Sequence, residues 1–167
     1  MIPVFFGGWP LLLMPVHIVF LELIIDPSCS LIFEAEDAEA NVMKRRPRRP
    51  DERLFSMGTI GMAVLQGLSV LVVCLGVFLL ARADHSAEAA RALTFATLVV
   101  AFVVIILVNR SWTRSAFAML RVPNAALRWV VLGACAFLAV ILVVPFAQRV
   151  FHFAPLHLLD LAICLLA

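Results

Sequence analysis

The sequence predicts an all-α protein, a polytopic bundle of about five transmembrane helices of which the last is truncated. Hydrophobic residues make up 64% of the 167 residues, and charged residues only 14%. A soluble domain usually has nearly a quarter of its residues charged. The mean hydropathy is +1.08. The apolar residues also gather in runs of about 20, the length that a helix needs to cross a bilayer core roughly 30 Å thick.

Five apolar segments follow one another along the chain. Residues 1–9 are assigned to the external end of a preceding helix or loop, and residues 10–34 to a helix that holds several ionisable groups. A basic loop, 35–56, separates this helix from the supporting helices of 57–167, which we expect at 57–81, 92–108, 129–147 and from Pro155 onward. The last segment reaches only about 18 Å, so we expect the chain to be truncated at its C-terminus.

The distribution of positive charge predicts the orientation of these helices. Ten of the 13 Lys and Arg residues fall in or beside two alternate loops, 35–56 and 109–128. The remaining three, Arg82, Arg91 and Arg149, fall near the opposite ends of the helices. Because cytoplasmic loops of membrane proteins are enriched in Lys and Arg, we expect both basic loops to be cytoplasmic and the N-terminus to be outside.

The run NVMKRRPRRPDER in the first basic loop has the composition of a nucleic-acid patch or a nuclear signal. Beside a membrane span, anchoring by positive charge is the better explanation, so we expect no nucleic-acid partner. Docking of a cytoplasmic domain on the same run stays open. Pro47 and Pro50 favour an extended segment there.

The run MPVHIVFLELIIDPSCS in the first segment holds the candidate site. Glu22 and Asp26 are four residues apart and therefore share one face of a helix. An ionisable residue in mid-membrane costs roughly 2.5–3.5 kcal/mol, and two carboxylates on one face also repel each other. A bound cation, a proton or a basic partner on another helix would offset this cost. We predict a cation or proton site at Glu22 and Asp26, with a salt bridge to another helix as the alternative.

Pro27 directly follows this pair and predicts a break in the helix near Asp26, because proline lacks a backbone donor and clashes with the preceding turn. Unwinding would free carbonyl oxygens beside the carboxylates, the hard ligands that Na⁺, K⁺ or Ca²⁺ prefer. His17 is a candidate proton partner or a packing residue, and Cys29 is a weak candidate for a soft-metal ligand. Asp160 is a further carboxylate in the last segment.

The run PVHIVFLELIIDPSCSLIFEAEDAEANVMKRRPRR, residues 15–49, resembles the sixth transmembrane helix and the following cytoplasmic loop of P-type cation-transporting ATPases. Calcium pumps and sodium/potassium pumps are the most similar branches. They share a Pro-Val start, two polar ligands four apart that end in Asp, a break rich in Pro or Gly, and a Met-Lys/Asp-Arg-x-Pro-Arg signature. The runs ARALTFATLVV and VNRS are similar to the eighth helix, so the resemblance extends over the family's sixth to tenth helices.

The resemblance implies that Glu22 and Asp26 bind the transported cation. Glu22 departs from the family pattern, because calcium pumps have Asn there and sodium/potassium pumps have Asp. Calcium pumps also place a ligand Glu in the eighth helix, where this chain has Phe102. A calcium site of that design is therefore not expected.

The printed sequence has no Asp-Lys-Thr-Gly phosphorylation motif and no Thr-Gly-Glu loop. We therefore expect no ATP hydrolysis by this chain alone and no cofactor in it, whereas ATP and Mg²⁺ are implied for an intact pump. The resemblance implies that the basic loop contacts the phosphorylation domain, and that the partners are the bilayer, the cation and the remaining helices and domains of the pump.

The leading hypothesis is the membrane ion-pathway portion of a cation-translocating P-type ATPase in a bacterial inner membrane. In such a pump the two carboxylates would bind the cation in one state and release it, or exchange it for protons, in the other. The alternative is a stand-alone, non-enzymatic membrane protein that acts as a binding or regulatory subunit.

Overall fold

Four long helices and two short ones lie in the parts of the chain that the computed structural model describes, residues 11–35, 42–44, 56–109 and 125–154. In chain order they are α2 (Pro15–Glu34), the 3-10 turn η1 (Val42–Lys44), α3 (Met57–Asp84), α4 (Ala87–Asn109), α6 (Ala125–Val143) and α7 (Pro145–Phe151). The described residues contain no strand, so the predicted all-α class is confirmed for them. The fifth predicted segment, from Pro155 onward, lies outside these ranges.

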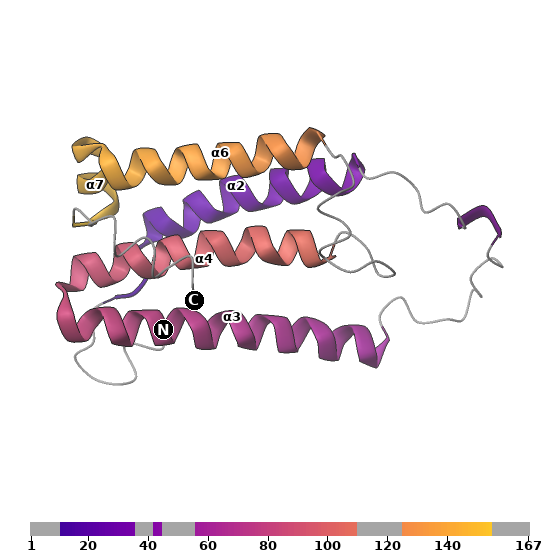
Figure 1. The fold of residues 1–167 in the computed structure, drawn as a ribbon, viewed down its shortest axis with the longest axis horizontal. Helices are drawn as coiled ribbons and strands as arrows, with labels where there is room; N and C mark the ends of the chain where they lie inside the picture. Colours follow the sequence, from indigo (N-terminus) through magenta and orange to yellow (C-terminus); the bar gives the residue numbers. More distant parts are fainter. Residues whose placement is uncertain (1–10, 36–41, 45–55, 110–124, 155–167) are drawn as a thin grey trace.

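Successive long helices run in opposite directions along the long axis of the bundle (Figure 1). The C-terminal ends of α2 and α4 and the N-terminal ends of α3 and α6 all lie at one end of the bundle. The described helix ends that flank residues 36–55 and 110–124 therefore all lie at that end, as the alternating charge pattern predicts. We call this the basic-loop end, and the end where α7 lies the α7 end.

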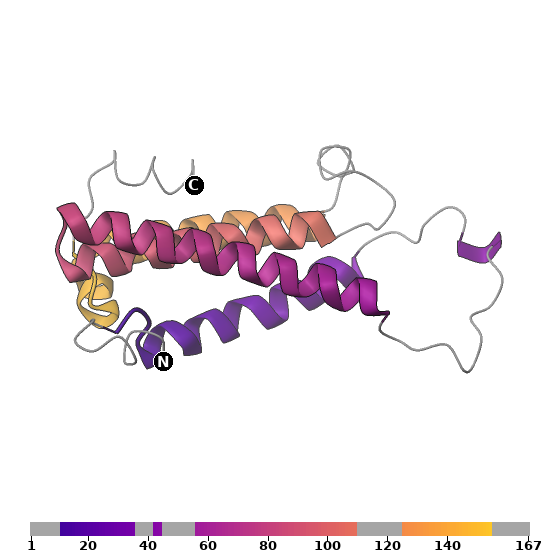
Figure 2. The ribbon, with the colours of Figure 1, turned by 90° about the horizontal axis from the view of Figure 1, so that it is seen from below.

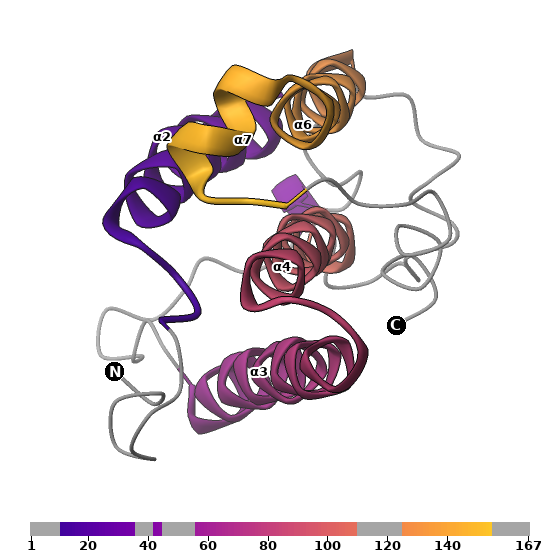
Figure 3. The same cartoon turned by 90° about the vertical axis from the view of Figure 1, so that its left-hand side faces the viewer.

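Helix α4 lies at the centre of the bundle (Figure 3). Helix α3 packs along α4 on one side, and α2 and α6 pack against each other and against α4 on the other. Seen from the α3 side, α3 covers α4 along most of its length, while α2 runs at an angle to both (Figure 2). As a result α4 is the best-buried long helix, and α3 presents most of its surface outward.

By length and composition, α2, α3, α4 and α6 are all able to cross a membrane. Their outward faces are strongly apolar: Leu23 on α2 is 71% exposed, Leu80 on α3 is 72% exposed and Val143 on α6 is 73% exposed. Water would not solvate such a surface, but lipid tails would. Trp129, in the second turn of α6, is 75% exposed, which is typical of a side chain at the membrane interface.

Side-chain caps define several helix starts. The Ser56 hydroxyl accepts a hydrogen bond of 3.1 Å from the Thr59 amide at the start of α3, and the Ser86 hydroxyl accepts one of 3.3 Å from the Ala89 amide at the start of α4. Each cap satisfies an amide that would otherwise lack a partner in the first helical turn. Helix α2 has Pro15 at its first positions, where proline costs no helical hydrogen bond.

The predicted helix over 129–147 is wrong in one respect, because the structure divides this region into α6 and α7 at Val144. Pro145 has no amide hydrogen and cannot continue the hydrogen-bond ladder of α6, so it becomes the first residue of α7 instead. The Gln148 side-chain amide donates to the carbonyl of Leu142. This bond satisfies a carbonyl that the break would otherwise leave without a donor.

Three groups of buried apolar side chains form the core. One joins α3 to α4 and includes Phe78 and Leu93. A second joins α4, α6 and α7 with the start of α2, and Phe95, Ile141 and Phe151 lie within it. A third, at the basic-loop end, consists of Ile32, Ile106 and Leu127.

Candidate functional site

The predicted site residues Glu22 and Asp26 lie in α2, one helical turn apart. The Glu22 side chain is exposed on the surface of the described bundle, and its neighbours Val19 and Leu23 are 67% and 71% exposed. This carboxylate therefore faces away from α4 and α6 on an otherwise apolar stretch of helix. In a membrane such a position requires a partner for the charge.

The predicted break near Asp26 is not present in this structure, in which α2 is one helix from Pro15 to Glu34 with Pro27 inside it. Proline removes the hydrogen bond from its own amide to the carbonyl of Leu23, four residues earlier. The loss of one bond does not end a helix that packs against its neighbours over several turns, and membrane helices commonly contain proline.

The described residues contain no group of three or more His, Cys, Asp and Glu that could hold a metal ion. A pair of carboxylates provides at most four oxygen ligands, whereas Ca²⁺ takes six to eight. If Glu22 and Asp26 bind such an ion, the other ligands come from carbonyl groups, water or segments beyond the described residues.

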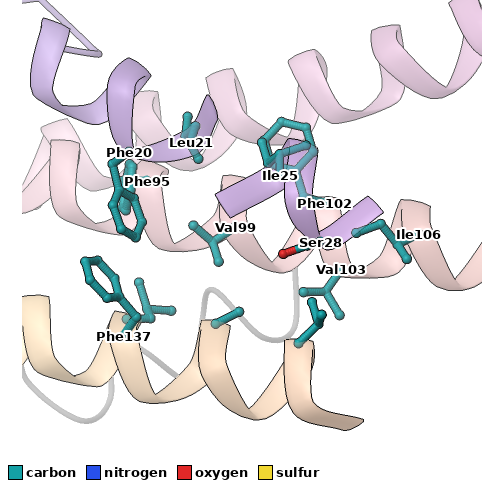
Figure 4. Close-up of a pocket in the computed structure, with 13 residues that line it drawn as sticks. Phe20, Leu21, Ile25, Ser28, Phe95, Val99, Phe102, Val103, Ile106 and Phe137 are labelled. Carbon is teal, nitrogen blue, oxygen red and sulfur yellow. The ribbon is translucent and has the colours of Figure 1, made fainter. Parts of the chain in front are cut away.

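Behind α2 lies a small apolar cavity of about 30 Å³ between α2, α4 and α6 (Figure 4). Phe20, Ile25 and Ser28 of α2 line it, and the Ser28 hydroxyl is the one side-chain polar group among its lining residues. Phe102 contributes to the wall from α4. Phe102, which the resemblance aligns with a ligand Glu of calcium pumps, is thus part of an apolar wall in this structure.

Of the two roles that the sequence allows for His17, a proton partner or a packing residue, the structure favours packing. Its side chain is completely buried. Its Nε2 lies 2.8 Å from the carbonyl oxygen of Phe151, and its Nδ1 lies 3.0 Å from the amide nitrogen of Met14. Both ring nitrogens are therefore engaged at the α7 end, and none is left for Glu22.

Arg91 is buried, whereas the sequence placed it only near the end of a helix. It lies in the second turn of α4 and is only 6% exposed. Its Nε donates to the carbonyl of Leu11 over 3.1 Å, and its Nη1 donates to the carbonyl of His152 over 3.0 Å. The side chain thus joins the segment before α2 to the segment after α7.

Sequence reasoning missed the roles of His17 and Arg91, although two weak signals were present. His17 is a polar residue in the first turn of an apolar helix, and Arg91 is a charged residue with alanine on either side. Neither signal identifies the carbonyl groups that these two side chains contact.

Cys29 is half-buried and packs against the third core group. Asp160 and most of the basic loop lie outside the described residues.

These features define a class of protein: a helical membrane bundle with a carboxylate on the uncovered face of one helix. Comparison with known sequences then gives the family. The family described as "Cation transporting ATPase, C-terminus" matches residues 10–167. The chain belongs to this family. It is an integral, multi-pass membrane chain that corresponds to the C-terminal membrane region of a P-type cation ATPase.

Two bacterial relatives support the assignment. The chain is 30% identical over 145 residues to a calcium-transporting ATPase of Bacillus subtilis (strain 168), an alignment that covers 86% of this chain and 16% of the relative. It is 36% identical over 74 residues to calcium-transporting ATPase 1 of Bacillus cereus (strain ATCC 10987 / NRS 248), which covers 43% of this chain and 8% of the relative. The chain thus spans a small fraction of the length of these relatives.

Proposed function

We propose that this chain forms part of the membrane pathway of an ATP-driven cation pump, and that Glu22 and Asp26 are ligands of the transported cation. The observation that supports this most directly is the Glu22 carboxylate on an uncovered apolar face of α2, in a chain of the cation-ATPase family. A cation that neutralises both carboxylates would remove their mutual repulsion and the cost of placing them in the bilayer.

The other parts of the proposed pump follow from the family. ATP and Mg²⁺ would act in phosphorylation and nucleotide-binding domains, for which the printed sequence has no motif. Remaining helices of the pump would cover the Glu22 face of α2 and complete the ligand set. The two carboxylates would bind the cation in one state and release it, or exchange it for protons, in the other.

We also propose a bacterial inner membrane as the location, with the N-terminus outside and the loops 35–56 and 109–128 in the cytoplasm. The charge pattern supports this orientation, and the ends of the helices that these loops connect all lie at one end of the bundle.

The test is cation transport by the intact pump that contains this segment, reconstituted in proteoliposomes. We expect Glu22→Gln and Asp26→Asn to lower the transport rate at least about tenfold, since each removes a charged oxygen ligand. Glu34→Gln is the matched control: it changes an exposed carboxylate three turns farther along α2, and it should transport normally. Wild-type transport by Asp26→Asn would reject the proposed site.

The size of the native product tests the alternative of a stand-alone subunit. An antibody against residues 44–53 should detect a band several times heavier than 18.4 kDa in membranes of the source organism. A band near 18.4 kDa would instead indicate a separate small membrane protein, and the next step would be to identify its partner.

A further inference from the structure

We infer that His17 is a positioning residue of the cation site: by its hydrogen bond to Phe151 it fixes the height and rotation of the helix that holds Glu22 and Asp26. This inference rests on the proposed function of the two carboxylates. His17 itself does not touch the cation. It acts through the backbone of α2, from a point one to two turns before the site.

The bonding pattern of His17 determines its tautomer. The Met14 amide can only donate, so Nδ1 must accept and has no hydrogen. Nε2 must then have the ring hydrogen, which it donates to the carbonyl of Phe151. The ring is also enclosed by aromatic neighbours, with centroid distances of 5.0 Å to Phe153 and 5.6 Å to Phe151. A side chain with two directed bonds and rings on its faces has little freedom to turn.

The carbonyl of Phe151, which accepts the hydrogen bond from His17, lies at the end of a helix and needs a donor from outside it. Phe151 is the last residue of α7, and the next residue, His152, takes the left-handed conformation with φ 53° and ψ 47°. Carbonyls at the C-terminal end of a helix lack partners within the helix. His17 satisfies the carbonyl of Phe151, and Arg91 satisfies that of His152. Two different helices thus hold the end of α7, and α2 is one of them.

The hydrogen bond has a geometric consequence for the site. Glu22 follows His17 by five residues, about 7.5 Å along a helix. Because a helix segment of this length is stiff, the position of His17 determines the height of the Glu22 backbone and the direction in which its Cα–Cβ bond leaves the helix. Beyond the carboxylates, Pro27 removes a helical hydrogen bond. The cavity of about 30 Å³ borders α2 at Phe20 and Leu21 as well as at Ile25 and Ser28, so it lies along the stretch that holds Glu22. The hydrogen bond of His17 to Phe151 therefore fixes α2 just before a stretch that packs against a cavity.

Two substitutions separate the hydrogen bond from the packing of the ring. His17→Phe keeps an aromatic ring but removes both bonds, whereas His17→Gln keeps a neutral donor and a neutral acceptor but removes the ring. In the reconstituted intact pump we expect His17→Phe to raise the half-saturating cation concentration about tenfold, the usual effect of losing a group that orients a ligand. The maximal rate at saturating cation should change much less. His17→Gln should restore most of the affinity.

Thr94→Val is the matched control. Thr94 is a completely buried polar residue of α4 whose hydroxyl donates to Ala90 in its own helix, so its removal disturbs the core without releasing α2. We expect an unchanged half-saturating concentration. Glu22→Gln in the same assay tests the site itself: if that variant transports normally, the proposed function fails rather than the role of His17.

Two results would overturn the inference. One is a wild-type cation affinity in His17→Phe, which would show that the ring alone is sufficient. The other is an affinity in His17→Gln as low as in His17→Phe, which would show that a neutral donor and acceptor at this position do not hold the helix. If His17→Phe does not accumulate in the membrane, His17→Asn replaces it, because its shorter amide cannot reach both partners. Wild-type affinity in His17→Asn would count equally against the role.

Discussion

The Nε2 atom of His17, in the first turn of α2, donates a hydrogen bond of 2.8 Å to the carbonyl oxygen of Phe151, the last residue of α7. This bond joins the first and the last helix that the structure describes. The Arg91 side chain makes a parallel link, from α4 to the carbonyls of Leu11 and His152. Directed polar contacts thus hold α2, α4 and α7 together at the α7 end of the bundle.

Replacement of Arg91 should destabilise this end of the bundle. Arg91→Met has a similar length but leaves two carbonyls without their donors. We expect the free energy of unfolding to fall by about 2–3 kcal/mol, the usual range for hydrogen bonds to a charged group. Arg91→Lys should recover only part of this, because an ammonium group lacks the planar fork of guanidinium. The measurement is unfolding of the purified chain by SDS in mixed micelles.

The control for this prediction is Arg128→Gln, at an exposed position near the start of α6. It should leave the unfolding free energy almost unchanged. Equal stability of Arg91→Met and the wild type would show that the two carbonyls find other donors, and that Arg91 does not hold the helix ends together.

The aromatic group around His17 offers a second prediction, on packing. Phe95 is fully buried, with ring centroids 5.3 Å from His17 and 5.5 Å from Phe153. Phe95→Ala would leave a cavity at the junction of α2, α4 and α7, and we expect a loss of about 3 kcal/mol in the same unfolding measurement. Phe146→Ala removes an equal volume from a side chain that is 76% exposed and should have little effect. Similar losses in both variants would contradict the packing described here.

The orientation of the helices can be tested by labelling of introduced cysteines, in a background where the four native cysteines are replaced by alanine. Ser86→Cys lies at the exposed connection between α3 and α4, and Asp51→Cys lies in the first basic loop. A maleimide that does not cross membranes should label Ser86→Cys in intact cells, because that connection is expected outside. It should label Asp51→Cys only after the cells are permeabilised. The reverse pattern would invert the proposed topology.

Some features of the chain could be predicted from sequence because they depend on local composition. Runs of apolar residues determine where helices cross a bilayer, and the arginines of the two basic loops give the alternation of direction. The spacing of Glu22 and Asp26 likewise places them one turn apart whatever the rest of the fold. The family signature in residues 15–49 depends on the same local pattern, and the match over residues 10–167 agrees with it.

Other features depended on contacts between distant segments. The sequence showed proline at 27 and at 145 and predicted a break only at the first. The structure has the opposite result, a continuous α2 and a divided α6–α7. At the second break the Gln148 side chain donates to the carbonyl of Leu142. Periodicity could not show this, since it does not report which side chains reach a freed carbonyl.

By itself, then, the sequence determined the number and direction of the described membrane helices and the placement of two carboxylates on one of them. Only the tertiary structure decided that His17 and Arg91 are buried, that Phe102 faces an apolar cavity, and that α7 folds back to meet α2. The physical reason is that membrane insertion depends on the polarity of each segment taken alone. Buried hydrogen bonds depend on partners more than a hundred residues away, as in the 134-residue separation of His17 and Phe151.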